Sequence, residues 1–400
     1  MSNEEFIQQH LRDDVRSLAL KRMPEGVDAT WCLQQIEGWQ LALKKLPQWA
    51  ATTNLWFPPR LSLEQCSSEL TALYKRDLIL RLLPDPAQRT KIIDFTGGFG
   101  VDFSYLAPSF QHAVYIERQE VLCNVARHNF PLLNLPNAEV VCTDFDADSE
   151  LLNHDYSLIY LDPARRDTAG RKVVAISDCT PDVTSLQERL TSYCHYMVIK
   201  FSPMLDITQA LREIKNVCEV HVISVHGECK ELLLVVKGCL ADTENQDSET
   251  TFHCTNLDSN DSAFATSANE IRQSQPSITT KPLAYLFEPN ASILKAGAQD
   301  ALACKLNLMK IHPASNLFFC DETLKNYPGR TFRVIAWSDF SKKSIKQLLS
   351  DTPQANLTIR NFPSTVAELR KKLKLREGGS TYLFATTLAD GSHALIKCEK

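Results

Sequence analysis

The sequence predicts an α/β protein: a mainly parallel β-sheet preceded by a helical region and followed by smaller α+β modules. From Lys91 onward, short apolar runs alternate with stretches of helix length, which is typical of βαβ units. The first 85 residues instead carry apolar side chains at helical intervals. With 400 residues, 44% of them hydrophobic and 23% charged, the chain has an ordinary globular composition and room for two or three domains.

Composition also excludes several classes of protein. The 13 cysteines are odd in number and contain no CxxC pair, so we expect reduced thiols in the cytoplasm rather than a disulfide framework. The first twenty residues carry acids and no apolar core, so we expect no signal peptide. No apolar run approaches the ~20 residues that span a bilayer. The net charge of −5 argues against nucleic-acid binding by the chain as a whole.

Helices are expected throughout residues 1–85. Phe6, Leu11 and Val15 begin a helical pattern, and Pro58-Pro59 interrupts it. A further helix is expected from Ser62, as its N-cap, to the residues before Pro84.

Seven strands are expected in residues 86–240. The apolar runs that predict them are KIIDF, AVYIE, AEVVC, SLIYLD, YMVIKF, EVHVISV and ELLLVV. Segments Gln119–Asn129 and Thr180–Ser192 have helix length between strands. Only HGECK separates the last two runs, which favours an antiparallel hairpin at the edge of the sheet.

Residues 241–280 are rich in Ser, Thr, Asn and Asp, which is typical of a linker, with at most a short strand around Phe252. Beyond Lys281, strand-like runs return as AYLFE, FRVIAW, NLTIRNF, YLFATT and HALIKC. Helices are expected at Ser292–Leu306, Ser341–Leu349 and Ser364–Leu373.

A glycine-rich turn follows the first strand. In KIIDFTGGFGVD the strand ends at Asp94, and Gly97, Gly98 and Gly100 precede a helix. Glycines let the backbone turn tightly and approach a ligand, and the helix N-terminus offers free N–H groups. Such a turn alone is weak evidence of a binding site.

Acidic residues end the next strands at the same edge. Glu117 ends the second strand, where a carboxylate can accept hydrogen bonds from both ribose hydroxyls of a nucleoside cofactor. After the third strand, Asp144 can accept from an adenine amino group while Phe145 packs on the ring. Three acids at three successive strand ends favour a nucleoside site over ordinary capping turns, although Asp144 alone fits a turn equally well.

The fourth and fifth strands add Asp162-Pro163 and Lys200. Asp162 ends its strand at the predicted ligand edge, and the proline stiffens the turn beside it. A plain Asp-Pro turn is an equal alternative. Lys200 can contact a substrate, or it can be a solvated lysine at a strand end.

The order of these pieces resembles class I S-adenosylmethionine-dependent methyltransferases, and more closely the bacterial family that joins such a domain to a C-terminal THUMP-like domain. The matching segments are LSLEQCSSELTALYKRDL, DFTGGFGVD, YLDPARRD, VIKFSPMLD, GECKELLL, YLFEPNASILKAG and NFPSTVAELRKKLKLREGGSTYLFAT. The resemblance implies S-adenosylmethionine as cofactor. It also implies a Rossmann-like sheet of seven strands over 86–240, followed by the 241–280 linker, a ferredoxin-like module over 281–327 and a THUMP-like domain over 328–400.

The resemblance also assigns site residues. Asp94, Gly98 and Gly100 match the cofactor loop, and Thr96 stands where many members have the first glycine. Glu117 matches the ribose-binding acid, and Asp144 the acid on the adenine side.

Asp162-Pro163 matches the start of the (Asp/Asn)-Pro-Pro-aromatic signature of amino-group methyltransferases, but Ala164 and Arg165 replace the second proline and the aromatic residue. Arg165 can stack on a base in place of that ring. Alternatively, Arg165 and Arg166 grip a phosphate.

The segment before the first strand often borders the cofactor in amino-methyltransferases, which makes Gln65, Ser67, Ser68 and Lys75 candidate contacts. Helix capping and solvation are the alternative for these four residues.

The last 45 residues carry a net charge of +4, in contrast to the rest of the chain. In the helix expected there, Val366, Leu369 and Leu373 would face the core, and Thr365 and Glu368 have the spacing of a capping box. The basic residues expected to face outward are Arg370, Lys371, Lys372 and Lys374. This surface and the THUMP-like resemblance predict an RNA partner, and a solvated helix face is the alternative.

The leading hypothesis is therefore a methyltransferase that acts on RNA, with Asp162, Pro163 and Arg165 at the catalytic position. Two alternatives stay open: a nicotinamide-dependent oxidoreductase, and a non-catalytic RNA-binding protein on a methyltransferase scaffold. We expect no metal site, an inert Cys229, and a salt-bridged turn formed by Glu228, Lys230 and Glu231.

Overall fold

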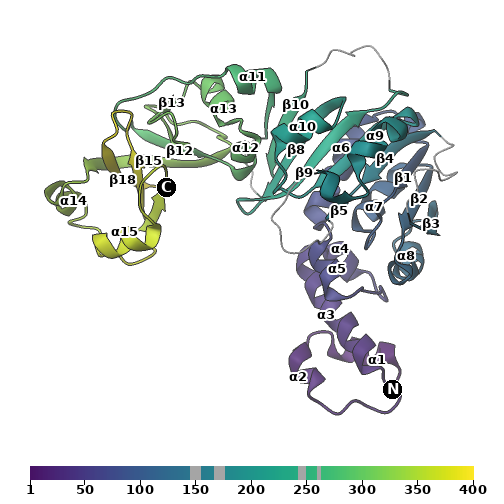
Figure 1. The fold of residues 1–400 in the computed structure, drawn as a ribbon. Coiled ribbons are helices and arrows are strands. Elements are labelled where there is room, and N and C mark those ends of the chain that lie inside the picture. The colour runs from purple at the N-terminus through teal and green to yellow at the C-terminus, as the bar shows by residue number, and fades with distance from the viewer. Residues whose placement is uncertain (145–154, 166–175, 242–248, 259–262) are drawn as a thin grey trace. The chain divides into compact units, whose positions relative to one another are not determined.

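The computed structural model describes residues 1–144, 155–165, 176–241, 249–258 and 263–400 (Figure 1). The chain forms two compact units. The first contains Met1–Cys218 and Leu233–Asp247, and the second contains Glu219–Leu232 and Ser248–Lys400. The segment from β8 (Val217–Val225) to β9 (Glu228–Lys237) contributes residues to both units.

Helices form the N-terminal region, as predicted: α1 (Asn3–His10), α2 (Val15–Ala19), α3 (Ala29–Lys45), α4 (Pro47–Ala51), α5 (Arg60–Gln65) and α6 (Glu69–Leu82). The single helix expected from Ser62 to Pro84 is wrong. The chain leaves helical geometry at Cys66, and a new helix begins after Ser68, whose hydroxyl accepts from the Thr71 N–H. Ser68, and not Ser62, is therefore the N-cap, because it precedes the first turn in extended backbone geometry.

The larger sheet has nine strands within the described ranges, in the order β11-β10-β8-β9-β7-β4-β1-β2-β3. Five are β1 (Lys91–Asp94), β2 (His112–Glu117), β3 (Ala138–Cys142), β4 (Tyr156–Leu161) and β7 (Cys194–Phe201), which pair in parallel. The accompanying helices are α7 (Val101–Leu106), α8 (Glu120–Leu132), α9 (Val183–Ser192) and α10 (Ile207–Glu213). Short 3-10 helices are η1 (Pro86–Gln88), η2 (Ala107–Ser109) and η4 (Ile176–Asp178), and β5 (Ala164–Arg165) pairs with β6 (Cys179–Thr180).

All seven predicted strands are present, but the expectation of a seven-stranded sheet is wrong. Strand β10 (Thr251–Asn256) pairs in parallel with β8, and β11 (Phe264–Ser267) pairs antiparallel with β10. Both lie in the polar segment that predicted a linker. The β8–β9 hairpin turns at His226-Gly227, both with positive φ, as a two-residue hairpin requires. It does not form the edge of the sheet, because β10 covers β8.

A second sheet of seven strands forms in the described C-terminal residues, in the order β13-β14-β12-β15-β18-β17-β16. Its strands are β12 (Tyr285–Pro289), β13 (Met309–Lys310), β14 (Phe318–Cys320), β15 (Gly329–Asp339), β16 (Asn356–Ile359), β17 (Thr381–Thr387) and β18 (His393–Glu399). The helices are α11 (Ala268–Gln273), α12 (Ala291–Ala296), α13 (Gln299–Lys305), α14 (Lys342–Leu348) and α15 (Val366–Leu373). The helix expected over Ser292–Leu306 is divided, because Gly297 has left-handed geometry and ends α12.

Helix α15 begins with the predicted capping box of Thr365 and Glu368. Leu369 is buried, as expected for a core position, but Val366 is 40% exposed. The prediction that Val366 faces the core is wrong, because it is the first residue of the helix and lies outside the apolar stripe.

Candidate active site

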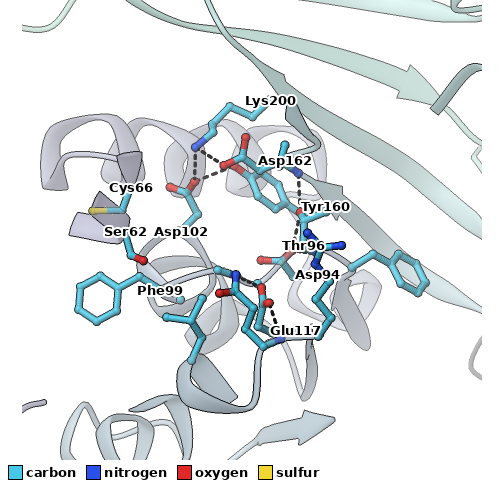
Figure 2. Close-up of a pocket in the computed structure, with 18 of the residues that line it drawn as sticks. Ser62, Cys66, Asp94, Thr96, Phe99, Asp102, Glu117, Tyr160, Asp162 and Lys200 are labelled. Carbon is cyan, nitrogen blue, oxygen red and sulfur yellow. Dashed lines mark hydrogen bonds and ion pairs between the residues drawn. The ribbon is translucent and has the colours of Figure 1, made fainter. Parts of the chain in front are cut away.

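A cavity of about 580 Å³ opens where β1, β2 and β4 end (Figure 2). Its lining includes the glycine loop, Glu117, Asp144, Asp162 and Lys200. The carboxyl ends of parallel strands meet at one edge, so side chains that are distant in sequence gather there. The volume lies in the range of cofactor pockets.

The loop after β1 is held by short-range hydrogen bonds. Asp94 is buried, and its Oδ1 accepts from the backbone N–H and the hydroxyl of Thr96, at 2.9 and 3.2 Å. The Thr96 hydroxyl oxygen in turn accepts from the Asp162 N–H at 2.5 Å, which connects the β1 and β4 loops. Gly98 and Gly100 have φ of 56° and 81°, the left-handed region that favours glycine.

Glu117 lies at the end of β2 and points to the glycine loop, as Figure 2 shows. One carboxylate oxygen accepts from the Gly98 N–H at 3.0 Å, and the other accepts from the Gln119 N–H at 2.8 Å. These bonds fix the side chain in the wall of the cavity.

A network of buried charges lies beside the loop. Asp102, in the first turn of α7, forms ion pairs with Lys75 at 3.0 Å and Lys200 at 3.5 Å. Lys200 also contacts Asp162 at 2.5 Å, and Figure 2 shows these three side chains pointing toward one another. The hydroxyls of Ser67 and Tyr160 each donate to Asp102 at 2.8 Å.

Exposure differs sharply within the network. The side chains of Lys75, Asp102 and Lys200 are 1%, 9% and 9% exposed, whereas that of Asp162 is 39% exposed. Asp162 is therefore the member that faces the cavity. The two lysines and Asp102 form the interior part, in which each charge is paired, as a buried charge requires.

The pKa values of the carboxyl groups diverge. Burial acts to raise the pKa of Asp102, but Lys75 and Lys200 outweigh it, and the pKa is lowered overall. Desolvation raises the pKa of Asp162, against the opposing effect of Lys200. Burial raises the pKa of Asp94 to about 8, although the Thr96 N–H opposes this shift. Carboxyls with separated pKa values in one cavity are typical of functional sites.

Cys66 is the thiol in the cavity wall. Its Sγ donates to the Leu63 carbonyl at 3.1 Å. Burial raises the pKa of this thiol to about 11, so it is protonated at neutral pH.

The structure brings together most residues of the predicted cofactor site. Asp144 is exposed and lines the cavity, and Pro163 is buried beside Asp162. The Arg165 backbone pairs with Cys179 in the β5–β6 ribbon. Phe145 and Arg166 lie outside the described residues, so their predicted roles stay predictions.

The alternative interpretation, in which Lys75 and Lys200 are solvated, is wrong. Lys200 and Lys75 are both buried and ion-paired. Gln65 and Ser67 line the cavity, whereas Ser68 caps α6. Sequence reasoning missed Asp102 and Tyr160 as partners of these lysines, because an acid in the first turn of a helix is explained by the helix dipole alone. The available signal was the position of Lys75, which shares the helical spacing of Ala72, Leu78 and Ile79 on the buried face of α6.

The C-terminal basic residues are placed separately. Lys371, Lys372 and Lys374 are exposed on or beside α15. Arg370 is not outward as predicted: it is only 19% exposed and donates to the Ala355 carbonyl at 3.1 Å.

The salt-bridged turn expected at the hairpin is found for Glu228 and Lys230, whereas Glu231 is buried. Lys230 pairs with Glu228 at 2.7 Å, and burial raises the pKa of Cys229.

Among the described residues, none of the helices has both the length and the apolar composition of a membrane span.

Comparison with known proteins identifies two C-terminal modules. Residues 285–328 match a family model described as a ferredoxin-like domain, and residues 329–400 match one described as THUMP domain-like. No curated protein matches the sequence.

Solved structures extend the comparison to the whole chain. A protein from Porphyromonas gingivalis W83, provisionally named a methyltransferase, is 34% identical, with a TM-score of 0.85 over 100% of this chain and 97% of its own. Two similarities are weak. A provisionally named class I S-adenosylmethionine-dependent methyltransferase from Listeria monocytogenes has 11% identity and a TM-score of 0.40, over 64% of this chain and 93% of its own. An rRNA methylase from Streptococcus thermophilus has 13% identity and a TM-score of 0.30, over 41% of this chain and 94% of its own.

The similarity to the P. gingivalis protein spans every element from the N-terminal helices to β18, including the glycine loop and the two C-terminal modules. The chain therefore belongs to the family of class I S-adenosylmethionine-dependent methyltransferases that carry a C-terminal THUMP-like domain.

Proposed function

We propose that the protein is an S-adenosylmethionine-dependent methyltransferase that acts on RNA. The observation that carries the proposal is the buried Lys75–Asp102–Lys200 network, which ends at the cavity-facing Asp162 beside the glycine loop. The family assignment favours this reaction over nicotinamide-dependent oxidation.

The cavity fits the cofactor in size and in donor chemistry. Glu117 is fixed in the wall, where its carboxylate would hold the ribose hydroxyls. Asp144 would accept from the adenine amino group. A Cβ added at Gly98 would meet only the Thr96 carbonyl, at 3.7 Å, so this position favours glycine because of its positive φ, whereas a Cβ at Gly97 would lie 2.2 Å from the Tyr115 ring. When bound, S-adenosylmethionine supplies an electrophilic methyl group.

Asp162 would hold the acceptor. Its exposure to the cavity lets the carboxylate accept a hydrogen bond, and then a proton, from the attacking atom. Lys200 binds this carboxylate and restricts its orientation. The Asp162 N–H bonds to Thr96, so the acceptor site and the cofactor loop have a fixed spacing. Such positioning supplies much of the rate in a direct displacement.

RNA is the proposed substrate because of the C-terminal modules. The THUMP-like match covers α15, where Lys371, Lys372 and Lys374 are exposed cations suited to phosphate contacts. The thirteen cysteines form no disulfide, which fits a reducing compartment such as the cytoplasm.

Two experiments test the proposal in sequence. Calorimetry with S-adenosylhomocysteine on ligand-free protein should show one binding site, and absence of binding contradicts the cofactor assignment. Total RNA from a strain lacking the gene, incubated with protein and methyl-labelled cofactor, should then gain label in one nucleoside by mass spectrometry. Binding of cofactor and RNA without methyl transfer would instead indicate a non-catalytic RNA-binding protein. The alternative is kept because Ala164 and Arg165 replace the second proline and the aromatic residue of the amino-methyltransferase signature.

A further inference from the structure

Two histidines and a glutamate lie together on β8 and β10, and none of them lines the methyltransferase cavity. In the parallel register of these strands, His253 is directly opposite His221. Glu219 is two residues before His221, so both side chains project from the same face of the strand. The backbone pairing therefore fixes the three side chains as neighbours.

The donor atoms converge. Glu219 Oε2 is 2.8 Å from His221 Nε2 and 3.8 Å from His253 Nε2. One ligand atom from each residue lies within 4.8 Å of the other two. The imidazole rings are stacked, with centroids 4.5 Å apart and planes 6° from parallel. The proximity of the three ligand atoms suits a cation, and one ring must rotate out of the stack for both nitrogen lone pairs to point at the same ion.

Burial makes this cluster a defined site rather than a surface coincidence. The His221 side chain is 2% exposed, that of Glu219 is 15% exposed and that of His253 is 28% exposed. Two ligands are thus held inside the protein, and the third opens toward solvent and leaves a path for an ion.

We propose that Glu219, His221 and His253 bind one divalent transition-metal ion of the zinc class. Two imidazole nitrogens and one carboxylate oxygen are a donor set that zinc accepts, whereas magnesium and calcium prefer oxygen donors alone. Zinc–nitrogen bonds of about 2.0–2.1 Å place tetrahedral donors about 3.3 Å apart. The three ligand atoms already lie within 4.8 Å of one another, so rotations of the side chains would reach that spacing.

Metal binding would replace a hydrogen bond within the cluster. The Glu219–His221 hydrogen bond gives way to coordination of both groups, and His221 coordinates through Nε2 as a neutral imidazole that carries its proton on Nδ1. The ion would connect β10 to β8. The ligands come from strands 32 residues apart in sequence, which is why no local Cys/His spacing predicted a metal site.

Calorimetry with ZnCl2 tests the proposal on the full chain, after chelator treatment and in the presence of a non-thiol reductant. We expect one high-affinity binding step, and a rise in Tm with zinc. Both should be lost in His253→Gln and in Glu219→Gln. His253→Gln is the main variant because its side chain is partly exposed, so the substitution is well tolerated.

His226→Asn is the matched control. His226 lies at the end of the same strand, its side chain is 82% exposed, and asparagine tolerates its positive φ. This variant should bind zinc as the wild type does. Cobalt substitution separates the cluster from the thiols, because thiolate ligands add strong near-ultraviolet charge-transfer bands and N/O ligands do not.

Wild-type zinc binding by His253→Gln, thiolate bands with cobalt, or no high-affinity step in the wild type would each overturn the proposal. S-adenosylhomocysteine affinity should be the same in His253→Gln and wild type, so this result is independent of the proposed methyl transfer.

Discussion

Lysines occupy two contrasting environments in this protein. Lys75 and Lys200 are buried and paired with carboxylates in the methyltransferase unit. Lys371, Lys372 and Lys374 are exposed on or beside α15 in the other unit. A buried ammonium ion loses its hydration and is retained only with compensating charges, whereas an exposed one keeps its water and its mobility.

The contrast separates two uses of the same residue. Lys200 binds the acid that faces the cavity and Lys75 binds the interior Asp102, so their effects should fall on chemistry and stability. The exposed lysines can act only on a partner that comes to them, so their effects should depend on salt. Each prediction below tests one side of this division.

The largest effect should come from the cavity-facing acid. We expect Asp162→Ala to lower the methyl-transfer rate by about 10²–10⁴-fold, the range for a positioned proton acceptor, with cofactor affinity little changed. Single-turnover kinetics and S-adenosylhomocysteine calorimetry measure the two quantities. Loss of cofactor binding in a folded Asp162→Ala protein would instead make this acid a cofactor ligand.

Lys75→Met should destabilise the fold by about 3–5 kcal/mol, because it leaves Asp102 buried with one cation fewer. Chemical denaturation measures this loss. Lys371→Met is the matched control, the same substitution at an exposed site, and should change stability by about 0.5 kcal/mol or less. Equal effects of the two substitutions would remove the distinction between the two environments.

Glu117→Ala should weaken S-adenosylhomocysteine binding by about 10- to 100-fold, because charge-assisted hydrogen bonds to the ribose are lost. Calorimetry gives the dissociation constant. Glu120→Ala, at an exposed glutamate in the first turn of α8, should bind as the wild type does. A folded Glu117→Ala protein with unchanged affinity would contradict the ribose role.

Replacing Lys371, Lys372 and Lys374 together by glutamine should weaken RNA binding by about tenfold at moderate salt and flatten its salt dependence, because fewer counterions are released. Filter binding across a salt series measures both. The cofactor dissociation constant should not change. An unaltered salt slope would show that these lysines are only a solvated helix face.

The last effect develops gradually with pH. Burial raises the pKa of Asp94 to about 8 in the folded protein, whereas the ordinary pKa of an aspartate is 3.8. Between these values the unfolded chain has released this proton and the folded protein retains it, so rising pH favours unfolding. Asp94→Asn removes this dependence. The Tm of the variant should therefore exceed that of the wild type by a margin that grows between pH 5 and pH 8, with about 2–4 °C in Tm for each kcal/mol of stability. A constant margin would contradict the raised pKa.

Much of the fold could be predicted because its signals are local. Each strand of the parallel sheet is one apolar run, and the glycine loop follows directly from the first. The short strand expected around Phe252 is present as β10, but its parallel pairing with β8 could not be predicted, because polar residues surround β10 and its partner strand is about 30 residues away. Strand β11 was not predicted at all, because it lies in the same polar segment and pairs only with β10 within the described residues. The same holds for the Asp102 network, which joins α6, α7 and β7 by tertiary contacts alone.

Exposure was harder to predict than position. Lys200 was placed correctly at a strand end, but the sequence left open whether it was solvated. Arg370 lies in a basic run, yet its guanidinium turns inward to a backbone carbonyl. Long flexible side chains can reach a buried partner or solvent from the same backbone position, so periodicity does not decide between them.

The protonated thiol of Cys66 has a consequence for the durability of the enzyme. On the proposed function, the cavity presents an electrophilic methyl group, which would alkylate a thiolate in its wall and inactivate the protein turnover by turnover. With a pKa of about 11, only on the order of one Cys66 side chain in ten thousand is a thiolate at neutral pH. Burial thus protects Cys66 from methylation by the cofactor. A substitution that admits water beside Cys66 would raise the thiolate fraction, and the protein would lose activity over fewer turnovers without a change in its fold.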